Sequence, residues 1–422
     1  MIALVPIIIL LPVSIISFIY SRKIAHPSVL ISTTWIMVFS LLLAFNNIYF
    51  TLDLVPVAII SVGIFFYCIS ALLADFGSSK VSFKNLGNSV NLYPVNIFLF
   101  ICVIMLPLYI YQQISMAGGS NNLLFAIRRS TLEGDGENLL SNFVLLSIFI
   151  TIFYLIKYIS DKNIKHLFLF IFAFITALVY ATLTGSKSPI LSLVIANGIT
   201  IIMSVRKGQF LFSFIILTTA FLFLISGLFL VNYAGVSSFG TPDRVLNAAL
   251  DYFLGGTVAF STNYESIMKF DNHQTIQNAF SSIPRRLGFD IPVYTIHYPY
   301  SSISPDRVTN VYTVFFPLIK EYSILGSIIV LSIFGFLHGI LYKISFRRAE
   351  VLAFYVITMS FTVTMIFGDP LLFGALTIVK YMTIGLLYSF LLFLFYRRSE
   401  KTMSKDDKES KTTYFRRTGG KI

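Results

Sequence analysis

The sequence predicts an all-α polytopic membrane protein with about eleven transmembrane helices. This prediction depends on the composition, the apolar runs and the distribution of basic residues. The chain of 422 residues is 56% hydrophobic and only 12% charged, and its mean hydropathy is +0.82. Soluble domains carry about 25% charged residues, so this composition excludes an ordinary water-soluble protein. Apolar runs long enough to cross a bilayer recur along the chain. Basic residues gather in alternate breaks between these runs.

The first predicted span is a retained helix and not a cleaved signal peptide. No basic residue precedes the apolar run 2–20, Arg22 and Lys23 follow it, and a small-residue cleavage site is lacking. The eleven predicted spans are centred on the ranges 2–20, 29–45, 54–73, 95–111, 139–156, 167–183, 190–205, 210–231, 324–342, 351–367 and 371–395.

The basic residues predict the orientation of these spans. Most of the 31 lysines and arginines lie in alternate connections or in the tail 396–422. Cytoplasmic loops carry such an excess, so we expect the N-terminus outside the cytoplasm and the C-terminus inside. The bias explains the net charge of +12 better than nucleic-acid binding does. One weak span more or fewer would reverse only the N-terminal side.

Residues 1–395 form a single transmembrane domain in this interpretation, with two long outer connections at 112–138 and 232–322 and a basic cytoplasmic tail at 396–422. The longer connection exceeds a simple link and is expected to contain short helices. Thr241-Pro242 is a typical helix start, with Thr as the N-cap and Pro at the first helical position. The apolar residues that follow share one face and predict a helix on the membrane surface: Val245, Leu246, Ala249, Leu250 and Phe253.

The same long connection concentrates arginines and tyrosines. A guanidinium group matches phosphate oxygens in bidentate geometry, so an arginine cluster above a membrane suits a lipid-linked diphosphate. The candidates for diphosphate binding are Arg285, Arg286 and Arg307, with Arg244 and Lys187 as second choices. Contact with lipid headgroups or nearby carboxylates is the alternative for the arginines, and interfacial anchoring is the alternative for the lysine.

Three short motifs carry a resemblance to a known family. Thr184-Gly185-Ser186-Lys187 resembles the Thr-Gly-Ser-Arg/Lys turn of O-antigen polymerases and ligases. Residues 251–260, DYFLGGTVAF, are similar to the segment that opens the large periplasmic loop of oligosaccharide repeat-unit polymerases. Residues 309–313, TNVYT, followed by EYSILG at 321–326, resemble their Asn-Val-Tyr-Thr … Asp-Phe-Gly-x-x-Gly pattern, although Glu321 and Ser323 stand where Asp and Gly are common. The chain thus resembles the Wzy-type O-antigen polymerase family.

The resemblance implies a glycosyltransferase of the bacterial inner membrane. It would transfer the growing glycan from undecaprenyl diphosphate onto an incoming lipid-linked repeat unit at the periplasmic face. The implied partners are the undecaprenyl-diphosphate-linked oligosaccharide, membrane lipids and a chain-length regulator. Arginines would stabilise the leaving diphosphate, and a base would accept the proton of the acceptor hydroxyl.

His297 is the first candidate base, because its pKa range suits proton acceptance near neutral pH. Asp306 is the alternative base, and Asp290, Glu265 and His273 compete with both. The predicted glycan contacts are Tyr298, Tyr312 and Asn310.

No cofactor and no metal are expected. The sequence has neither a Walker loop nor a dinucleotide fingerprint, and the acids at 133, 135 and 137 lack the ligand count of a calcium motif. Two alternatives stay open: an O-antigen ligase, and a lipid-linked oligosaccharide flippase or exporter. A flippase is expected to have internal repeats and charged or broken helices at the midplane. Here the polar residues concentrate in one loop, with His338, Asp369-Pro370 and Lys380 as exceptions.

Overall fold

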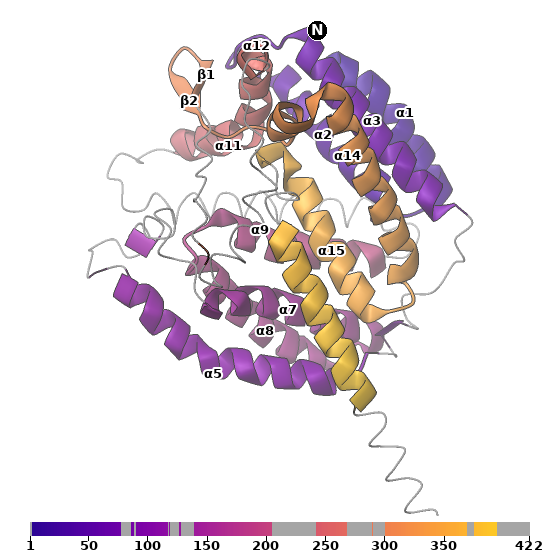
Figure 1. Cartoon of the computed structure of the whole chain (residues 1–422), viewed down its shortest axis with the longest axis vertical. Coiled ribbons are helices and arrows are strands. Elements are labelled where there is room, and N and C mark those ends of the chain that lie inside the picture. Colours follow the sequence, from indigo (N-terminus) through magenta and orange to yellow (C-terminus); the bar gives the residue numbers. More distant parts are fainter. Residues whose placement is uncertain are drawn as a thin grey trace, which may run out of the picture.

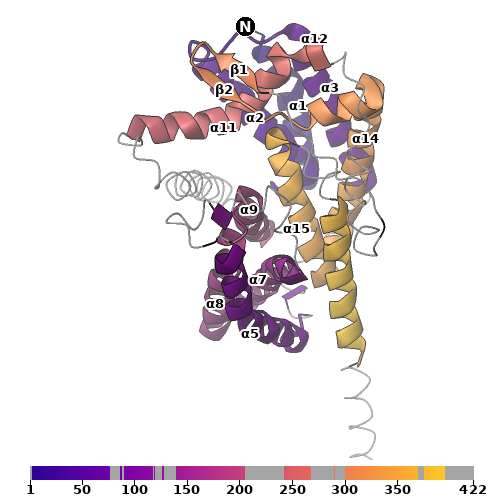
Figure 2. The same cartoon turned by 60° about the vertical axis from the view of Figure 1, so that its left-hand side comes forward.

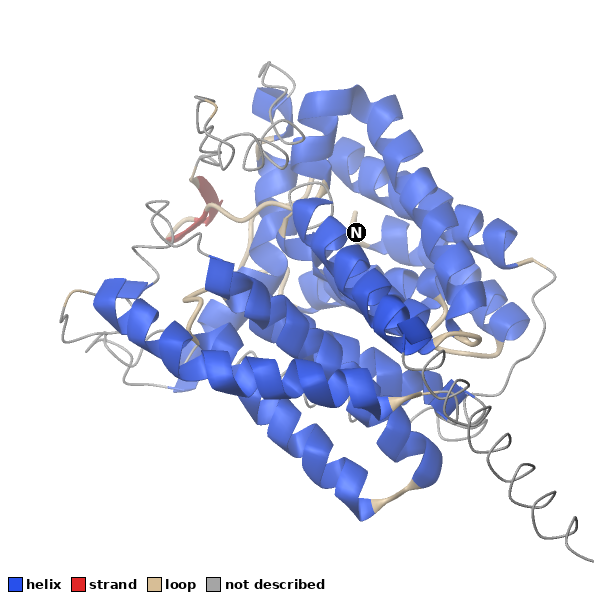
Figure 3. Cartoon of the chain, turned by 60° about the horizontal axis from the view of Figure 1, so that its bottom comes forward, coloured by secondary structure: helices blue, strands red, loops and turns tan. Residues whose placement is uncertain are grey.

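The computed structural model describes residues 2–76, 86–87, 90–116, 118, 126–127, 139–204, 242–267, 289, 300–368 and 375–394. The regular secondary structure of this part of the chain is helical apart from one short hairpin (Figure 3). Ten of its helices are long and apolar enough to cross a membrane, which confirms the predicted all-α multi-pass fold. They are α1 (Leu4–Ser21), α2 (Pro27–Ala44), α3 (Leu54–Asp75), α5 (Leu92–Met116), α7 (Asn142–Asp161), α8 (Ile164–Thr182), α9 (Lys187–Ser204), α14 (Phe315–Ser345), α15 (Ala349–Val363, continued by the 3-10 turn η2, Thr364–Phe367) and the helix Ala375–Leu394.

The predicted eleventh span, 210–231, lies outside the described residues, as do the tail 396–422 and most of the connection 112–138. The other predicted spans each coincide with one observed helix. A short 3-10 turn, η1 (Leu139–Ser141), leads into α7.

The long helices form two groups, which are clearly separated in Figure 2. Helices α1, α2, α3 and α14 pack together in one group, and α5, α7, α8 and α9 form the other. Helix α15 lies between them (Figure 1) and contacts α2 and α14 on one side and α7 and α9 on the other. Each group buries apolar side chains, and α15 joins the two cores.

Small residues let α3 and α14 approach closely. A Cβ atom added to Gly335 would overlap the carbonyl oxygen of Tyr67, and one added to Gly339 would overlap that of Ala71. The two glycines are four residues apart and therefore lie on one helix face. This is the small-xxx-small arrangement by which membrane helices pack when no hydrophobic force distinguishes lipid from protein.

Basic connections meet at one end of the bundle, which we call the basic end. Lys23 follows α1 and donates to the carbonyl of Met203 near the end of α9 (3.2 Å). Lys343, in the last turn of α14, donates to the carbonyl of Phe76 just after α3 (3.1 Å). The connections after α1, α3, α9 and α14 therefore share an end, as the charge bias requires. Which side of the membrane this end faces stays a prediction.

The opposite end, called here the hairpin end, carries the described part of the long connection. It contains α11 (Pro242–Thr262), α12 (Tyr264–Ile267) and the antiparallel strands β1 (Ser301–Ser304) and β2 (Arg307–Thr309), at the upper left of Figure 1. Helix α11 begins at Pro242, as predicted. The hairpin was not predicted, although Pro305-Asp306 between runs containing Ile and Val is a turn signal.

The single apolar face predicted for residues 245–253 does not continue through the second half of α11. Residues 253–261 are all buried, among α2, α3, η2 and the hairpin. A helix that is apolar on all sides is expected to be buried. The run FLGGTVAF at 253–260 has only one polar side chain, Thr257, and therefore no polar face. The single apolar face read from residues 245–253 did not take this second half into account.

Helix α14 begins inside the predicted loop. The span was expected from residue 324, whereas the helix starts at Phe315 and breaks at Ser323, whose backbone has φ 64° and ψ 179°. The segment before the break lies at the hairpin end, and the segment after it descends along α3. The predicted exit from the loop therefore coincides with the break and not with the start of the helix.

Candidate functional site

Two adjacent glycines allow the hairpin end to close around α11. A Cβ added to Gly255 would lie 3.2 Å from the side chain of Ile303 on β1, and one added to Gly256 would lie 2.8 Å from the carbonyl oxygen of Ile366 in η2. The hairpin and η2 therefore approach α11 more closely than side chains would allow. This packing fixes the position of the residues one turn earlier, Asp251 and Tyr252.

The carboxylate of Asp251 joins three distant segments. Arg307 of β2 donates from Nη1 to Asp251 Oδ1 at 3.0 Å, and the hydroxyl of Tyr49 donates to the same oxygen at 2.9 Å. Tyr49 lies in the connection between α2 and α3. The side chains of Arg307 and Asp251 are 21% and 27% exposed, so the ion pair lies at the edge of the packed region.

The protonation states of this cluster follow from burial and from the ion pair. Burial, reinforced by the charge of Asp251, raises the pKa of the Tyr49 hydroxyl well above its usual range, so the phenol keeps its proton and donates. Burial opposes the charge on Arg307, but the bond to Asp251 outweighs it and raises the pKa of Arg307. The cluster therefore consists of a cation, a carboxylate and a neutral donor.

Lys187 reaches the next residue of α11. Its Nζ lies 4.6 Å from the centre of the Tyr252 ring, and that ring stacks on Phe367 of η2 with a centroid distance of 4.6 Å. A cation over an aromatic face is held by the negative potential of the ring. Two predicted cations, Lys187 and Arg307, thus lie against consecutive residues of one helix.

The turn before Lys187 is closed by its own hydrogen bonds. The hydroxyl of Thr184 accepts from the amide of Ser186 at 3.1 Å and donates to the carbonyl of Ala181 at 2.7 Å. Gly185 adopts a positive φ of 65°, which a glycine tolerates best. The Thr-Gly-Ser sequence therefore forms a rigid turn that places Lys187 at the first position of α9.

The other described candidates lie around the hairpin. Asp306 is exposed in the turn, and a hydrogen bond from Ser304 (2.7 Å) lowers the pKa of its carboxyl, which makes it a weaker proton acceptor. Asn310 is exposed after β2. Tyr312 is only 1% exposed and packs against Phe316, so its ring belongs to the core. Glu265 is exposed on α12.

The remaining candidates lie outside the described residues: His297, Arg285, Arg286, Tyr298, His273 and Asp290. Arg244 lies in the first turn of α11, but its side chain is not among those described. The functional roles given to these residues therefore stay predictions. Within the described part of the chain, no group of three or more His, Cys, Asp or Glu residues is placed to hold a metal ion.

Three residues of the cluster were not among the predicted site residues: Tyr49, Asp251 and Tyr252. Asp251 and Tyr252 open the motif DYFLGGTVAF, and this motif was a usable signal. Tyr49 follows Asn46-Asn47 in a short break between two spans, and nothing in its sequence neighbourhood points to residue 251. Its role depends on a contact between residues 202 positions apart.

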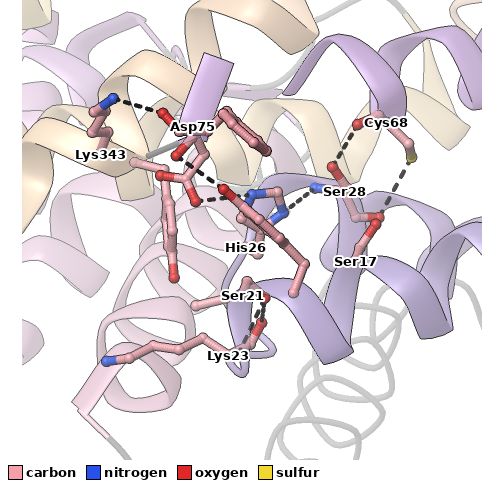
Figure 4. Close-up of polar contacts among 12 residues, drawn as sticks. Ser17, Ser21, Lys23, His26, Ser28, Cys68, Asp75 and Lys343 are labelled. Carbon is pink, nitrogen blue, oxygen red and sulfur yellow. Dashed lines mark hydrogen bonds and ion pairs between the residues drawn. The ribbon is translucent and has the colours of Figure 1, made fainter. Parts of the chain in front are cut away.

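A second polar cluster is buried at the basic end (Figure 4). His26 precedes α2, and its Nδ1 accepts from the amide of Ser28 at 3.3 Å. Burial lowers the pKa of His26 to about 3, so the ring is neutral. Because Nδ1 is the acceptor, Nε2 carries the proton, and it lies 3.8 Å from Oδ2 of Asp75 at the end of α3.

Tyrosines enclose this pair. The ring of Tyr342 on α14 meets the ring of His26 edge-on at 5.0 Å, and the hydroxyl of Tyr355 on α15 donates to the carbonyl of Ala25 at 2.6 Å. The side chains of His26 and Asp75 are 0% and 3% exposed. The cluster therefore ties four helices together at the basic end and offers no surface to a large substrate.

Comparison with known proteins finds no match for this chain among family models, curated proteins or solved structures. The two clusters differ in what they can do. The one at the hairpin end is partly exposed and, with Lys187 and Tyr252 added to Tyr49, Asp251 and Arg307, combines two cations, a carboxylate, a neutral donor and an aromatic ring. The one at the basic end is sealed. The hairpin-end cluster is therefore the candidate functional site.

Proposed function

We propose that this multi-pass membrane protein is a surface-polysaccharide polymerase of the bacterial inner membrane. It transfers a growing glycan from undecaprenyl diphosphate onto an incoming lipid-linked repeat unit at the hairpin end. The observation that carries the proposal is the convergence of Lys187 and Arg307 on Asp251-Tyr252. A diphosphate leaving group needs fixed positive charge where its own charge develops, and two cations held by packed elements meet that need.

The donor groups of Arg307 support this role. A guanidinium carries five N–H donors in a fixed fork, and the described contact with Asp251 uses Nη1. Such a fork also matches phosphate oxygens in bidentate geometry. Lys187 contributes a point charge over the ring of Tyr252. Arg285 and Arg286 complete the proposed anion site as predictions from the sequence.

The aromatic and amide groups nearby suit a glycan. Tyr252 and Phe367 stack with an angle of 27° between their planes and form an apolar aromatic pair, and Lys187 lies over the Tyr252 ring. The exposed Asn310 follows β2, which packs against α11. Sugars combine apolar ring faces with hydroxyl groups, so a flat ring beside polar side chains is a suitable surface for them.

Deletion of the gene tests the proposal against its alternatives. A polymerase deletion leaves single repeat units on the lipid A core, because ligation continues without polymerisation, and the lipopolysaccharide ladder on a gel collapses to one band. A ladder of normal length would contradict the polymerase. Loss of even the single-unit band would instead indicate a ligase or a flippase.

A further inference from the structure

We propose that Asp251 is the proton acceptor for the attacking sugar hydroxyl; this inference depends on the proposed function. The geometry of its carboxylate carries the proposal. Tyr49 and Arg307 both donate to Oδ1, at 2.9 and 3.0 Å. Among the described residues, Oδ2 takes no hydrogen bond. The carboxylate is thus oriented through one oxygen while the other is available to a ligand.

The position of Asp251 suits a base at the edge of a substrate site. Its side chain is 27% exposed, whereas residues 253–261 of α11 are all buried. The residue is held by the α2–α3 connection, by β2 and by its own helix, so the carboxylate has little freedom to turn away. Fixed orientation is what a general base requires, because proton transfer needs hydrogen-bond reach to the hydroxyl.

Asp251 is also correctly placed relative to the cation that would hold the leaving group. Consecutive helix residues point about 100° apart. Asp251 and Tyr252, whose ring is contacted by Lys187, therefore lie beside each other on α11 without occupying the same space. The base and the leaving-group site are therefore adjacent but distinct. Asp306 suits the role less well, because it is exposed in the hairpin turn and accepts a hydrogen bond from Ser304.

The proposed step is balanced in protons and electron pairs. The acceptor hydroxyl gives its proton to Oδ2 of Asp251, and its oxygen forms a bond to the anomeric carbon of the donor glycan. The bond between that carbon and the diphosphate oxygen breaks, and the diphosphate leaves with the electron pair. Lys187 and the remaining donors of Arg307 stabilise the developing charge, and Asp251 then releases the proton to water.

The Asp251→Asn variant separates this role from a structural one. Asparagine keeps an Oδ1 that accepts from Tyr49 and Arg307, so the three segments stay joined, but its amide cannot accept a proton. We expect the kcat for polymer formation to fall by about two to four orders of magnitude, with KM and the thermal midpoint in detergent little changed. Asp53→Asn, at an exposed position of the same end, makes the same charge change and should retain the wild-type rate.

The assay uses proteoliposomes of the full chain and the lipid-linked oligosaccharide extracted from the deletion strain. A second variant, Asp251→Ala, should regain part of its rate when sodium formate supplies a carboxylate, which a structural role would not predict. An Asp251→Asn rate within tenfold of wild type, or an Asp251→Ala variant that formate leaves inactive, would overturn the inference. Wild-type protein that forms no polymer would overturn the proposed function itself.

Discussion

At the scale of the residue, Arg307 pairs with Asp251 and, in the proposed function, binds the diphosphate. Its substitutions should therefore affect catalytic rate and stability separately. We expect Arg307→Ala to lower the rate of polymer formation by about one to two orders of magnitude, because a charge-assisted hydrogen bond to phosphate contributes about 1.5–3 kcal/mol. Arg307→Lys should restore part of the rate, since a point charge cannot reproduce bidentate geometry. The length distribution of the polymer on a gel measures both.

The stability effect of the same variants should be small. The ion pair between Arg307 and Asp251 is partly exposed, and such pairs contribute about 0–1 kcal/mol because solvent screens them. The control is the thermal midpoint of each variant in detergent. An Arg307→Ala protein that reaches the membrane, unfolds at the wild-type temperature and makes polymer of normal length would show that Arg307 only joins β2 to α11.

His26 makes stability depend on pH in a predictable direction. Its folded pKa is about 3, whereas its ordinary value is 6.5. Between these pH values the unfolded chain binds a proton that the folded chain does not. The free energy of unfolding is therefore highest above pH 6.5 and decreases as the pH falls. The loss is about 1.4 kcal/mol per pH unit, or about 2 kcal/mol at pH 5.

The His26→Gln variant isolates this contribution. Glutamine does not titrate, and its side-chain oxygen can accept from the amide of Ser28 in place of Nδ1. Thermal unfolding in detergent at pH 7.5 and at pH 5 gives the comparison. Wild type should lose more stability than the variant on acidification. Equal losses would mean that His26 is already protonated in the folded protein and paired with Asp75.

At the scale of the element, the α3–α14 contact depends on two glycines. Gly335→Ala or Gly339→Ala should destabilise the fold by about 1–3 kcal/mol or more, because the added methyl meets a backbone carbonyl of α3 that cannot move alone. Gly385→Ala is the matched control, since a Cβ there meets no atom within 4 Å. It should be neutral or stabilising by up to about 1 kcal/mol, from helix propensity. Equal midpoints for all three variants in detergent would contradict close packing at this crossing.

At the scale of the whole molecule, the two ends of the bundle are expected to face opposite sides of the membrane. Ser302→Cys places a thiol at the hairpin end and Arg348→Cys places one at the basic end, both at exposed positions. The two natural cysteines, Cys68 and Cys102, are buried and give a low background. A membrane-impermeant maleimide should label Ser302→Cys in intact cells and Arg348→Cys only after the cells are broken. The reverse pattern would place the proposed site in the cytoplasm and exclude the mechanism.

The division into two helix groups could not be read from hydropathy. All ten described spans are apolar, and hydropathy does not say which of them pack together. Their packing depends on small residues such as Gly335 and on buried polar groups such as His26. Among the ten described spans, the one formed by α15 and η2 is the most buried, with 67% of an 18-residue stretch buried. Its hydropathy is similar to that of other spans and does not indicate a central position. The helix packing shows that position, because α15 contacts both groups.

The sequence by itself determined the fold class, the approximate bounds of ten spans, the clustering of basic connections and the start of α11 at Pro242. These features depend on local composition, because a segment enters the membrane according to its own hydrophobicity and a helix begins according to its own caps. The tertiary structure decided the burial of α11, the hairpin, the break at Ser323 and the meeting of Tyr49, Lys187 and Arg307 at residues 251–252. Those contacts join segments far apart in the chain, and helix packing alone brings them together.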